Sequence, residues 1–147
     1  MNFVAIDPAT HTGWATNNPE VHGTWDLRVK RDESDGMRVL RFKSKFQELC
    51  RIAKPDVVGF ERPAGRNARG IITQSELIGI IKSFCIENHI EYRAYSSTEL
   101  KKFATGKGNS GKDLMIQAAR EKLSYSGDND NEADALWILE LLKHDLL

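Results

Sequence analysis

Phe3-Val4-Ala5-Ile6-Asp7-Pro8 is a short apolar run that stops at an acidic residue and a proline. Such a run predicts a buried strand that ends in a turn. A second run of the same kind, Val57-Val58-Gly59-Phe60, ends at Glu61. Apolar residues between the two recur at helical spacing over residues 37–54. Because crossover connections of this type are right-handed and join parallel strands, we expect the two runs to lie side by side in one sheet.

The remaining pattern completes a mixed α/β fold. Residues 13–16 and 21–27 read as strands that extend the first run into an antiparallel meander. A loop over Arg62–Gly70 precedes a helix from about 71 to 88, and a fifth strand covers 90–95. Ser96 and Glu99 form a capping box for a short helix, and further helices are predicted over 112–123 and about 132–143. The sequence thus predicts one domain, residues 1–147, with a five-stranded mixed sheet flanked by helices.

Three acidic residues stand where this fold would bring them together. Asp7 and Glu61 end neighbouring parallel strands, so their carboxylates should meet at one edge of the sheet. Two carboxylates about 5 Å apart repel by roughly 3 kcal/mol at an effective dielectric constant near 20, which favours a bound cation. Asp134 is the lone acid in the apolar helix segment Ala133–Leu139, and such a residue is seldom buried without a partner. Asn131 and Asp130 lie one turn earlier.

Each of these residues also has a purely structural interpretation. Asp7 before Pro8 could form an Asx-turn, and Asp130 or Asn131 could simply cap the last helix. Taken together, Asp7, Glu61 and Asp134 favour a metal site. Hard oxygen ligands select Mg²⁺ or Mn²⁺.

Composition and charge narrow the function classes. The chain has no net charge, but residues 62–112 hold nine basic against four acidic residues, and residues 113–147 hold three against eight. The segments Arg62–Gly70 and Leu100–Lys112 contain no acid, which is typical either of a solvated face or of contacts to nucleic-acid phosphates. No apolar run approaches the ~20 residues that span a bilayer, and the start lacks the features of a signal peptide. With Cys50 and Cys85 as the two cysteines, we expect a reducing, cytoplasmic location.

Several other chemistries fit poorly. The four histidines have no zinc-ligand spacing with either cysteine. The loop Gly106–Lys112 approaches a P-loop, but Asp113 follows where that motif needs Ser or Thr. The strand–Asp–glycine opening also occurs in actin-like sugar kinases, which need a second, duplicated domain that 147 residues do not hold.

Three segments in this order resemble the RuvC-type Holliday-junction resolvases, and their compact phage-encoded branch in particular. They are Val4–Ala15 (VAIDPATHTGWA), Val57–Glu61 (VVGFE) and Asn131–Leu136 (NEADAL), with Gly106–Lys112 resembling the basic loop of that family. The resemblance covers nearly the whole chain. It implies a ribonuclease-H-like fold, a homodimer, and Mg²⁺-dependent nicking of two symmetrically placed strands of a four-way DNA junction. The family's fourth ligand is usually Asp or His, but this sequence has Asn131 there, so either Asn131 or Asp130 is the candidate.

The resemblance and the residues together predict a mechanism. Two Mg²⁺ ions, for which Mn²⁺ would substitute, would activate water and hold the leaving oxygen, with Asp7, Glu61, Asp134 and Asn131 or Asp130 as ligands. The resemblance puts Lys107 or Lys112 near the cut phosphate, and we favour Lys112. Expected DNA contacts are Arg62, Arg66, Arg69, Lys101 and Lys102, together with the two loop lysines.

The sequence leaves three matters open. The helix predicted over 71–88 is apolar over a wide arc, which favours a dimer interface over a helix covered by its own chain. Two other functions also remain, namely a nuclease for RNA or RNA–DNA hybrid and a junction-binding protein that does not cleave. The loop Arg62–Gly70 lacks the aromatic residue with which bacterial relatives disturb base stacking, so the way the junction would be opened is undetermined.

Overall fold

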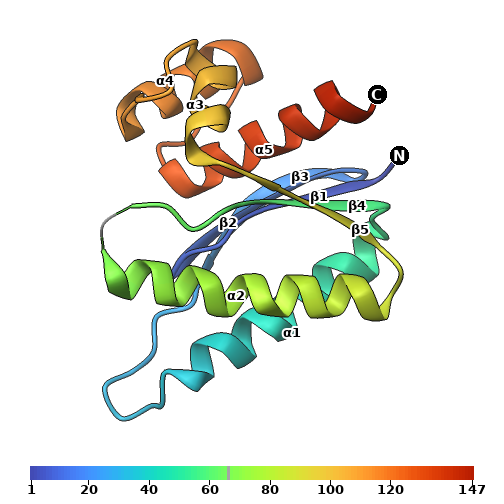
Figure 1. Cartoon of the computed structure of the whole chain (residues 1–147), viewed down its shortest axis with the longest axis vertical. Coiled ribbons are helices and arrows are strands. Elements are labelled where there is room, and N and C mark those ends of the chain that lie inside the picture. Colours follow the sequence, from blue (N-terminus) through green and yellow to red (C-terminus); the bar gives the residue numbers. More distant parts are fainter. Residues whose placement is uncertain (66) are drawn as a thin grey trace.

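The computed structural model describes residues 1–65 and 67–147 and contains one five-stranded sheet with strand order β3-β2-β1-β4-β5 (Figure 1). The strands are β1 (Phe3–Asp7), β2 (His11–Asn17), β3 (Glu20–Asp26), β4 (Val57–Glu61) and β5 (Glu91–Tyr95). The helices are α1 (Gly36–Ala53), α2 (Ala68–Glu87), α3 (Ser97–Thr105), α4 (Lys112–Leu123) and α5 (Asp130–Leu146). This arrangement confirms the predicted mixed α/β fold.

The centre of the sheet is the parallel pair β1 and β4. Both strands are buried along their whole length, and their register pairs Phe3 with Val57 and Ile6 with Phe60. β2 and β3 continue from β1 as an antiparallel meander, and β5 adds a further parallel strand beside β4. The predicted adjacency of the two apolar runs is therefore confirmed. β1 and β4 end at the same edge of the sheet, and Asp7 and Glu61 are their last residues.

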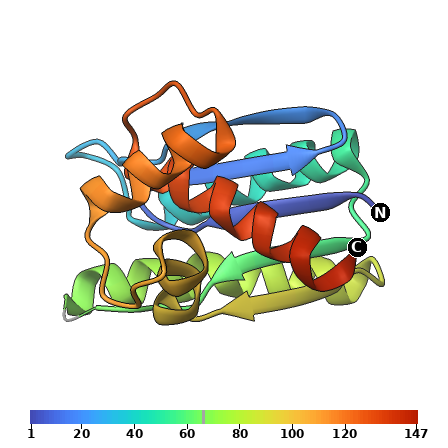
Figure 2. The same cartoon turned by 90° about the horizontal axis from the view of Figure 1, so that it is seen from above.

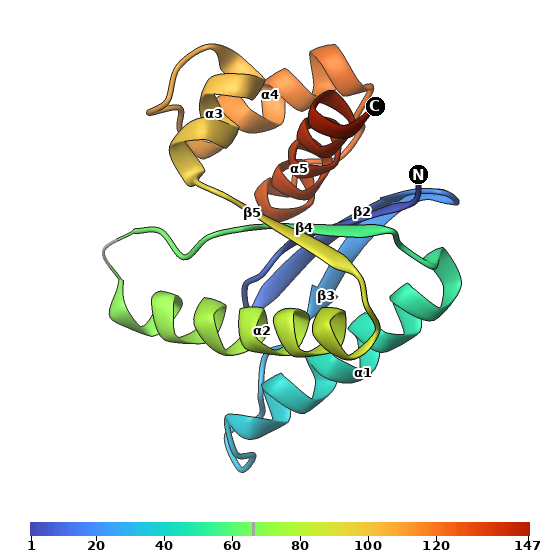
Figure 3. The same ribbon diagram turned by 45° about the vertical axis from the view of Figure 1, so that its right-hand side comes forward.

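Helices cover the two faces of the sheet as separate layers (Figure 3). α1 and α2 lie on one face, where Val4 and Ile6 of β1 pack with Phe42 and Phe46. α5 lies across the other face with α3 and α4 outside it, and there Phe3 and its neighbours pack against the apolar side of α5 (Figure 2). Alternate residues of β1 thus enter different cores, as the two-residue period of a strand requires.

α5 approaches the sheet closely because glycines leave it room. A Cβ atom added at Gly13 of β2 would lie 1.9 Å from the carbonyl oxygen of Asn131, and one added at Gly59 would lie 2.8 Å from the side chain of Leu142. The first contact involves backbone on both sides, so a side-chain rotation cannot relieve it. Gly13 therefore determines how deeply the start of α5 sits on β2.

Two helices begin earlier than the sequence pattern predicted. α2 starts at Ala68 instead of about Ile71, because the Asn67 side chain accepts a hydrogen bond from the Arg69 amide at 3.0 Å. α5 starts at Asp130, because Asn129 accepts one from the Glu132 amide at 2.9 Å. The interpretation of Asp130 or Asn131 as the helix cap is therefore wrong, since Asn129 is the cap.

Other local predictions are confirmed. The Ser96–Glu99 capping box forms at the start of α3. Cys50 and Cys85 are both buried and free. Among the described residues, no helix combines the length and apolar character needed to cross a membrane.

We expect Gly13→Ala to lower the free energy of unfolding by about 3 kcal/mol or more, because overpacking a fixed backbone contact costs more than the usual 1–3 kcal/mol of a core insertion. Denaturant unfolding followed by circular dichroism measures the change. The matched control is Gly79→Ala in α2, where an added Cβ meets no atom within 4 Å, and this helical substitution should stabilise by about 0.5–1 kcal/mol. Equal effects at the two positions would contradict the role given to Gly13.

Candidate metal centre

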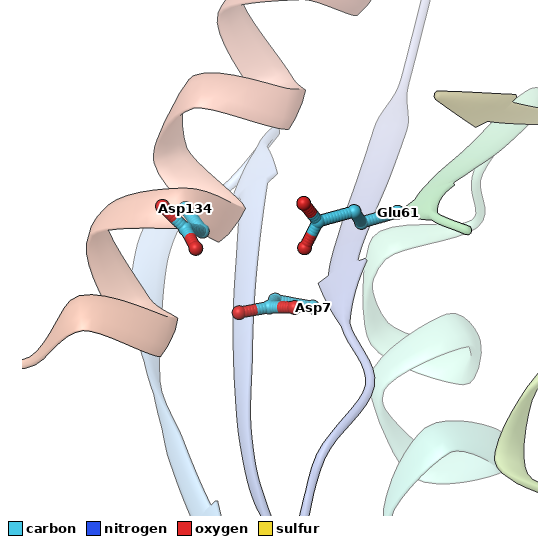
Figure 4. Close-up of side chains that lie close together, drawn as sticks. All are labelled: Asp7, Glu61 and Asp134. Carbon is cyan, nitrogen blue, oxygen red and sulfur yellow. The ribbon is translucent and has the colours of Figure 1, made fainter. Parts of the chain in front are cut away.

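Three carboxylates converge at the edge of the sheet where β1 and β4 end (Figure 4). Asp7 and Glu61 close the two parallel strands, and Asp134 reaches them from the second turn of α5. One oxygen from each residue lies within 4.8 Å of the others. The sheet register brings the first two together, and the close seating of α5 on β2 adds the third.

Asp7 and Glu61 are buried and Asp134 is half-buried, and this perturbs the acidity of all three side chains. Asp7 is 3% exposed, and the pKa of its carboxyl is raised well above the usual range, first by burial and then by the charges of Asp134 and Glu61. Burial also raises the pKa of Glu61. The pKa of Asp134 is raised to about 8 by burial and then by the charges of Glu61 and Asp130. Without a cation, the cluster therefore holds protons near neutral pH.

The donor set fits a divalent metal ion. The Oδ1 atom of Asp134 is buried and has no hydrogen-bond partner within residues 1–65 and 67–147, although a buried carboxylate oxygen normally has one. A cation between the three side chains would use this oxygen and relieve the repulsion that raises the pKa values. Carboxylate oxygens favour Mg²⁺ or Mn²⁺ over softer metals.

Both candidates for a fourth ligand lie in the first turn of α5, close to the cluster. The charge of Asp130 helps to raise the pKa values of Asp7 and Asp134. Asp130 also pairs with Lys112, with 3.6 Å between Oδ2 and Nζ. The backbone carbonyl of Asn131 packs against Gly13. Both Asp130 and Asn131 line a cavity of about 670 Å³ beside the cluster.

The lysines of the acid-free segment Leu100–Lys112 differ in their distance from the carboxylates. Lys112 and Lys101 both line a cavity of about 300 Å³ with Glu61 and Asp134. Their positive charges lower the pKa of Asp134 against the effect of burial. Lys107 is exposed in the loop between α3 and α4, where its carbonyl accepts a hydrogen bond from Ser110, and it is not among the described residues that line either cavity. Lys101, predicted from the sequence only as a DNA contact, thus shares a cavity with two of the three carboxylates.

Three other predicted DNA contacts are exposed, on the segment after Glu61 and on α3. Arg62 is exposed directly after Glu61, and its amide donates a 2.8 Å hydrogen bond to Tyr95. Arg69 is exposed in the first turn of α2, and Lys102 is exposed on α3. Arg66 lies outside the described residues.

Ser97 is a site residue that the sequence reasoning missed. It lines the same cavity as Glu61, and its side chain lowers the pKa of the Glu61 carboxyl against the effect of burial. β5 pairs Tyr95 with Glu61, so the first residues of α3 necessarily lie beside Glu61. The capping box at Ser96, read together with the sheet order, could have pointed to Ser97.

The raised pKa of Asp134 predicts how the stability of the metal-free protein depends on pH. Its pKa is about 8 in the folded state and 3.8 for the free side chain, so the folded state binds the extra proton between these values. The stabilisation is complete below about pH 4 and is lost as pH rises toward 8. We expect the melting temperature in EDTA to fall between pH 6 and 8, and Asp134→Asn to flatten that slope. The same slope in the variant would contradict the assignment.

Comparisons with known proteins agree with this geometry. No family model matches the chain. The crossover junction endodeoxyribonuclease RuvC of Caldicellulosiruptor saccharolyticus is 29% identical over 146 residues, covering 92% of this chain and 88% of that protein.

Solved structures share the fold. Thermus thermophilus RuvC superposes with a TM-score of 0.72 and 21% identity, over 94% of this chain and 90% of its own. The same protein in complex with a Holliday junction substrate gives a TM-score of 0.73, 21% identity and the same coverage. The yeast mitochondrial Holliday junction resolvase Ydc2 gives 0.64 with 12% identity, over 97% of this chain and 80% of its own. The chain is therefore similar in sequence to one RuvC, at 29% identity, and shares the fold of the solved RuvC structures.

Proposed function

We propose that the chain is a structure-specific endonuclease that resolves four-way DNA junctions by metal-dependent hydrolysis, with paired symmetric nicks. The observation that carries this proposal is the group of three carboxylates, Asp7, Glu61 and Asp134, within 4.8 Å of one another at the sheet edge. The similarity of the chain to a crossover junction endonuclease favours DNA junctions as the substrate. The solved structure of a similar protein in complex with a Holliday junction favours the same substrate.

The three carboxylates would hold two Mg²⁺ ions, with Mn²⁺ as a substitute. The Asp134 oxygen that has no partner among the described residues would be one ligand. Metal held by these residues would supply an activated water and charge stabilisation for the leaving oxygen of the phosphodiester. Ser97 would help to set the charge state of Glu61, because its side chain lowers the pKa of that carboxyl. Asp7 is 3% exposed and would hold a metal ion from the buried side of the cluster.

A fourth oxygen ligand would come from Asn131 or Asp130 in the first turn of α5. An amide oxygen can coordinate a hard cation, although it contributes less charge than a carboxylate. Asp130 has the charge that Asn131 lacks, and its contact with Lys112 would have to open for it to bind metal.

The lysines that share a cavity with the carboxylates would act on the phosphate. Lys112 is 81% exposed at its side chain, so it can reach a bound backbone and offset the charge that develops in the transition state. Lys101 would do the same from α3, while Arg62, Arg69 and Lys102 would contact flanking phosphates. Arg66 and Lys107 are further candidates from the sequence.

The proposed nuclease would act as a homodimer, because two symmetric cuts need two centres. α2 is the candidate interface, since Ile72 and Ile86 are 59% and 68% exposed on it. The free, buried thiols of Cys50 and Cys85 fit a reducing compartment, so we propose a cytoplasmic location, in a host cell if the chain is phage-encoded.

A nicking assay on a labelled four-way junction tests the proposal. With Mg²⁺ we expect paired symmetric nicks, and with Ca²⁺ or EDTA none. Asp7→Asn should lower the nicking rate by more than about 100-fold, because loss of a metal ligand should exceed the 10–100-fold cost of losing a group that only supports a ligand. Its junction affinity, measured in Ca²⁺ by gel shift, should stay near that of the wild type.

The matched control is Asp32→Asn, an exposed residue between β3 and α1, which should cut like the wild type. Duplex DNA and RNA–DNA hybrid serve as competing substrates. Tight junction binding without nicks in Mg²⁺ or Mn²⁺ would make the chain a binding protein. Preferential cutting of the hybrid would point to a ribonuclease.

Replacement of the two loop lysines should have different effects. Lys112→Ala should lower the nicking rate at saturating junction by about 100-fold, as expected for loss of a charge that stabilises the transition state. Lys107→Ala should mainly weaken junction affinity and its salt dependence, because Lys107 lies outside both cavities that border the described centre. Single-turnover kinetics separate the two effects. A larger rate loss for Lys107→Ala would reverse the assignment.

A further inference from the structure

A hydrogen-bonded cluster outside the carboxylate centre holds the segment that leads into α5. We call it the Glu132 network, and its members are His22 of β3, Tyr125, Asn129 and Glu132. His22 and Glu132 are 110 residues apart in sequence, and Nδ1 of His22 lies 2.5 Å from Oε2 of Glu132. The network therefore joins the edge of the sheet to the first turn of α5.

Both oxygens of the Glu132 carboxylate have partners in this network. The Tyr125 hydroxyl donates a 2.9 Å hydrogen bond to Oε1 of Glu132, and Nδ1 of His22 forms a hydrogen bond with Oε2. The same hydroxyl accepts a 3.1 Å hydrogen bond from the Asn129 amide, and the Asn129 side chain accepts one from the Glu132 amide. The rings of His22 and Tyr125 also meet edge to face, with centroids 5.9 Å apart.

The connection between α4 and α5 wraps around the Tyr125 hydroxyl. Tyr125 is 5% exposed, and a Cβ atom added at Gly127 would lie 2.4 Å from its hydroxyl oxygen. Arg120 of α4 donates a 3.0 Å hydrogen bond to the Gly127 carbonyl. This path is consequently well defined from the end of α4 to the cap of α5.

The network fixes the turn of α5 that carries the candidate ligands. Asp130 and Asn131 directly precede Glu132, and Asp134 lies two residues after it. On its other side, the same turn rests on Gly13 through the Asn131 carbonyl. β1, which carries Asp7, is paired with β2, and β2 is paired with β3, which carries His22. The distance from Asp134 to Asp7 is thus set through the sheet on one side and the Glu132 network on the other.

We infer that His22, Tyr125 and Glu132 are positioning residues for the metal centre, which hold the first turn of α5 so that Asp134 and its neighbours meet Asp7 and Glu61. The inference rests on the proposed metal-dependent activity. It needs no contact between these residues and the substrate. Productive sites tolerate displacements of only about 0.5 Å, so releasing this turn should weaken metal binding before it unfolds the protein.

The test uses the full chain with Tyr125→Phe, Glu132→Ala and Glu132→Gln. Tyr125→Phe keeps the ring and removes only the hydroxyl. Glu132→Gln keeps an oxygen and an amide group that can still pair with Tyr125 and His22, so it serves as the conservative rescue. The matched control is Glu140→Ala on the same helix, where Glu140 pairs with Lys143 at 3.1 Å two turns further on.

We expect Tyr125→Phe and Glu132→Ala to raise the Mg²⁺ concentration for half-maximal nicking by about 10-fold or more, with KM for the junction unchanged. The rise in melting temperature caused by Mg²⁺ should shift to higher concentration by the same factor, which gives a readout without turnover. Glu132→Gln should recover most of the wild-type response, and Glu140→Ala should retain it.

Two outcomes would overturn the inference. One is an unchanged Mg²⁺ dependence in Tyr125→Phe and Glu132→Ala. The other is an equal shift in Glu140→Ala, which would indicate a general loss of helix stability. Failure of the proposed function itself looks different, because the wild-type chain would then show no Mg²⁺-dependent nicking and no Mg²⁺-dependent change in melting temperature.

Discussion

Repulsion among three closely spaced carboxylates, two buried and one half-buried, is the constraint around which the rest of this structure is arranged. Asp7, Glu61 and Asp134 bring their oxygens within 4.8 Å of one another, and burial raises the pKa of each. A folded protein keeps such a cluster only where the surrounding elements hold it in place or a cation compensates it. The cluster is therefore a cost to stability in the metal-free state and the basis of the proposed metal binding.

The frame that holds the cluster has two parts of different origin. The parallel pairing of β1 and β4 places Asp7 and Glu61 at the same edge of the sheet, and backbone hydrogen bonds alone hold this pairing. Asp134 arrives from a helix, so its place depends on how α5 is seated. Gly13 permits the close approach, and the Glu132 network holds the first turn from the other side. Substitutions at these remote positions can disturb the centre without touching it.

Positive charge is distributed around the cluster rather than within it. Lys101 and Lys112 share a cavity with Glu61 and Asp134, and both lower the pKa of Asp134. Lys112 also contacts Asp130, which ties the start of α4 to the start of α5. Since the chain has no net charge, attraction of a polyanion depends on this local arrangement and not on the total.

The sequence by itself determined the strands, the adjacency of β1 and β4, and the two carboxylates at the ends of that pair. Apolar runs that stop at Asp7 and Glu61 are local signals, and the handedness of the crossover leaves one arrangement for them. Asp134 could also be predicted as a site residue from the sequence, because a single acidic residue on an apolar helix needs a partner. The starts of α2 and α5 were predicted two to three residues late, since several polar residues precede each helix and only the hydrogen bonds of Asn67 and Asn129 identify the caps.

Tertiary structure alone decided what depends on contacts between distant segments. Lys101 and Lys107 both lie in an acid-free stretch, and the pairing of β4 with β5 is what brings α3 and Lys101 beside Glu61. The contact of His22 with Glu132 joins residues that are 110 positions apart in the sequence, and no periodic sequence pattern predicts it. Spacing along the chain encodes local geometry, whereas these contacts arise only when α5 packs onto the sheet.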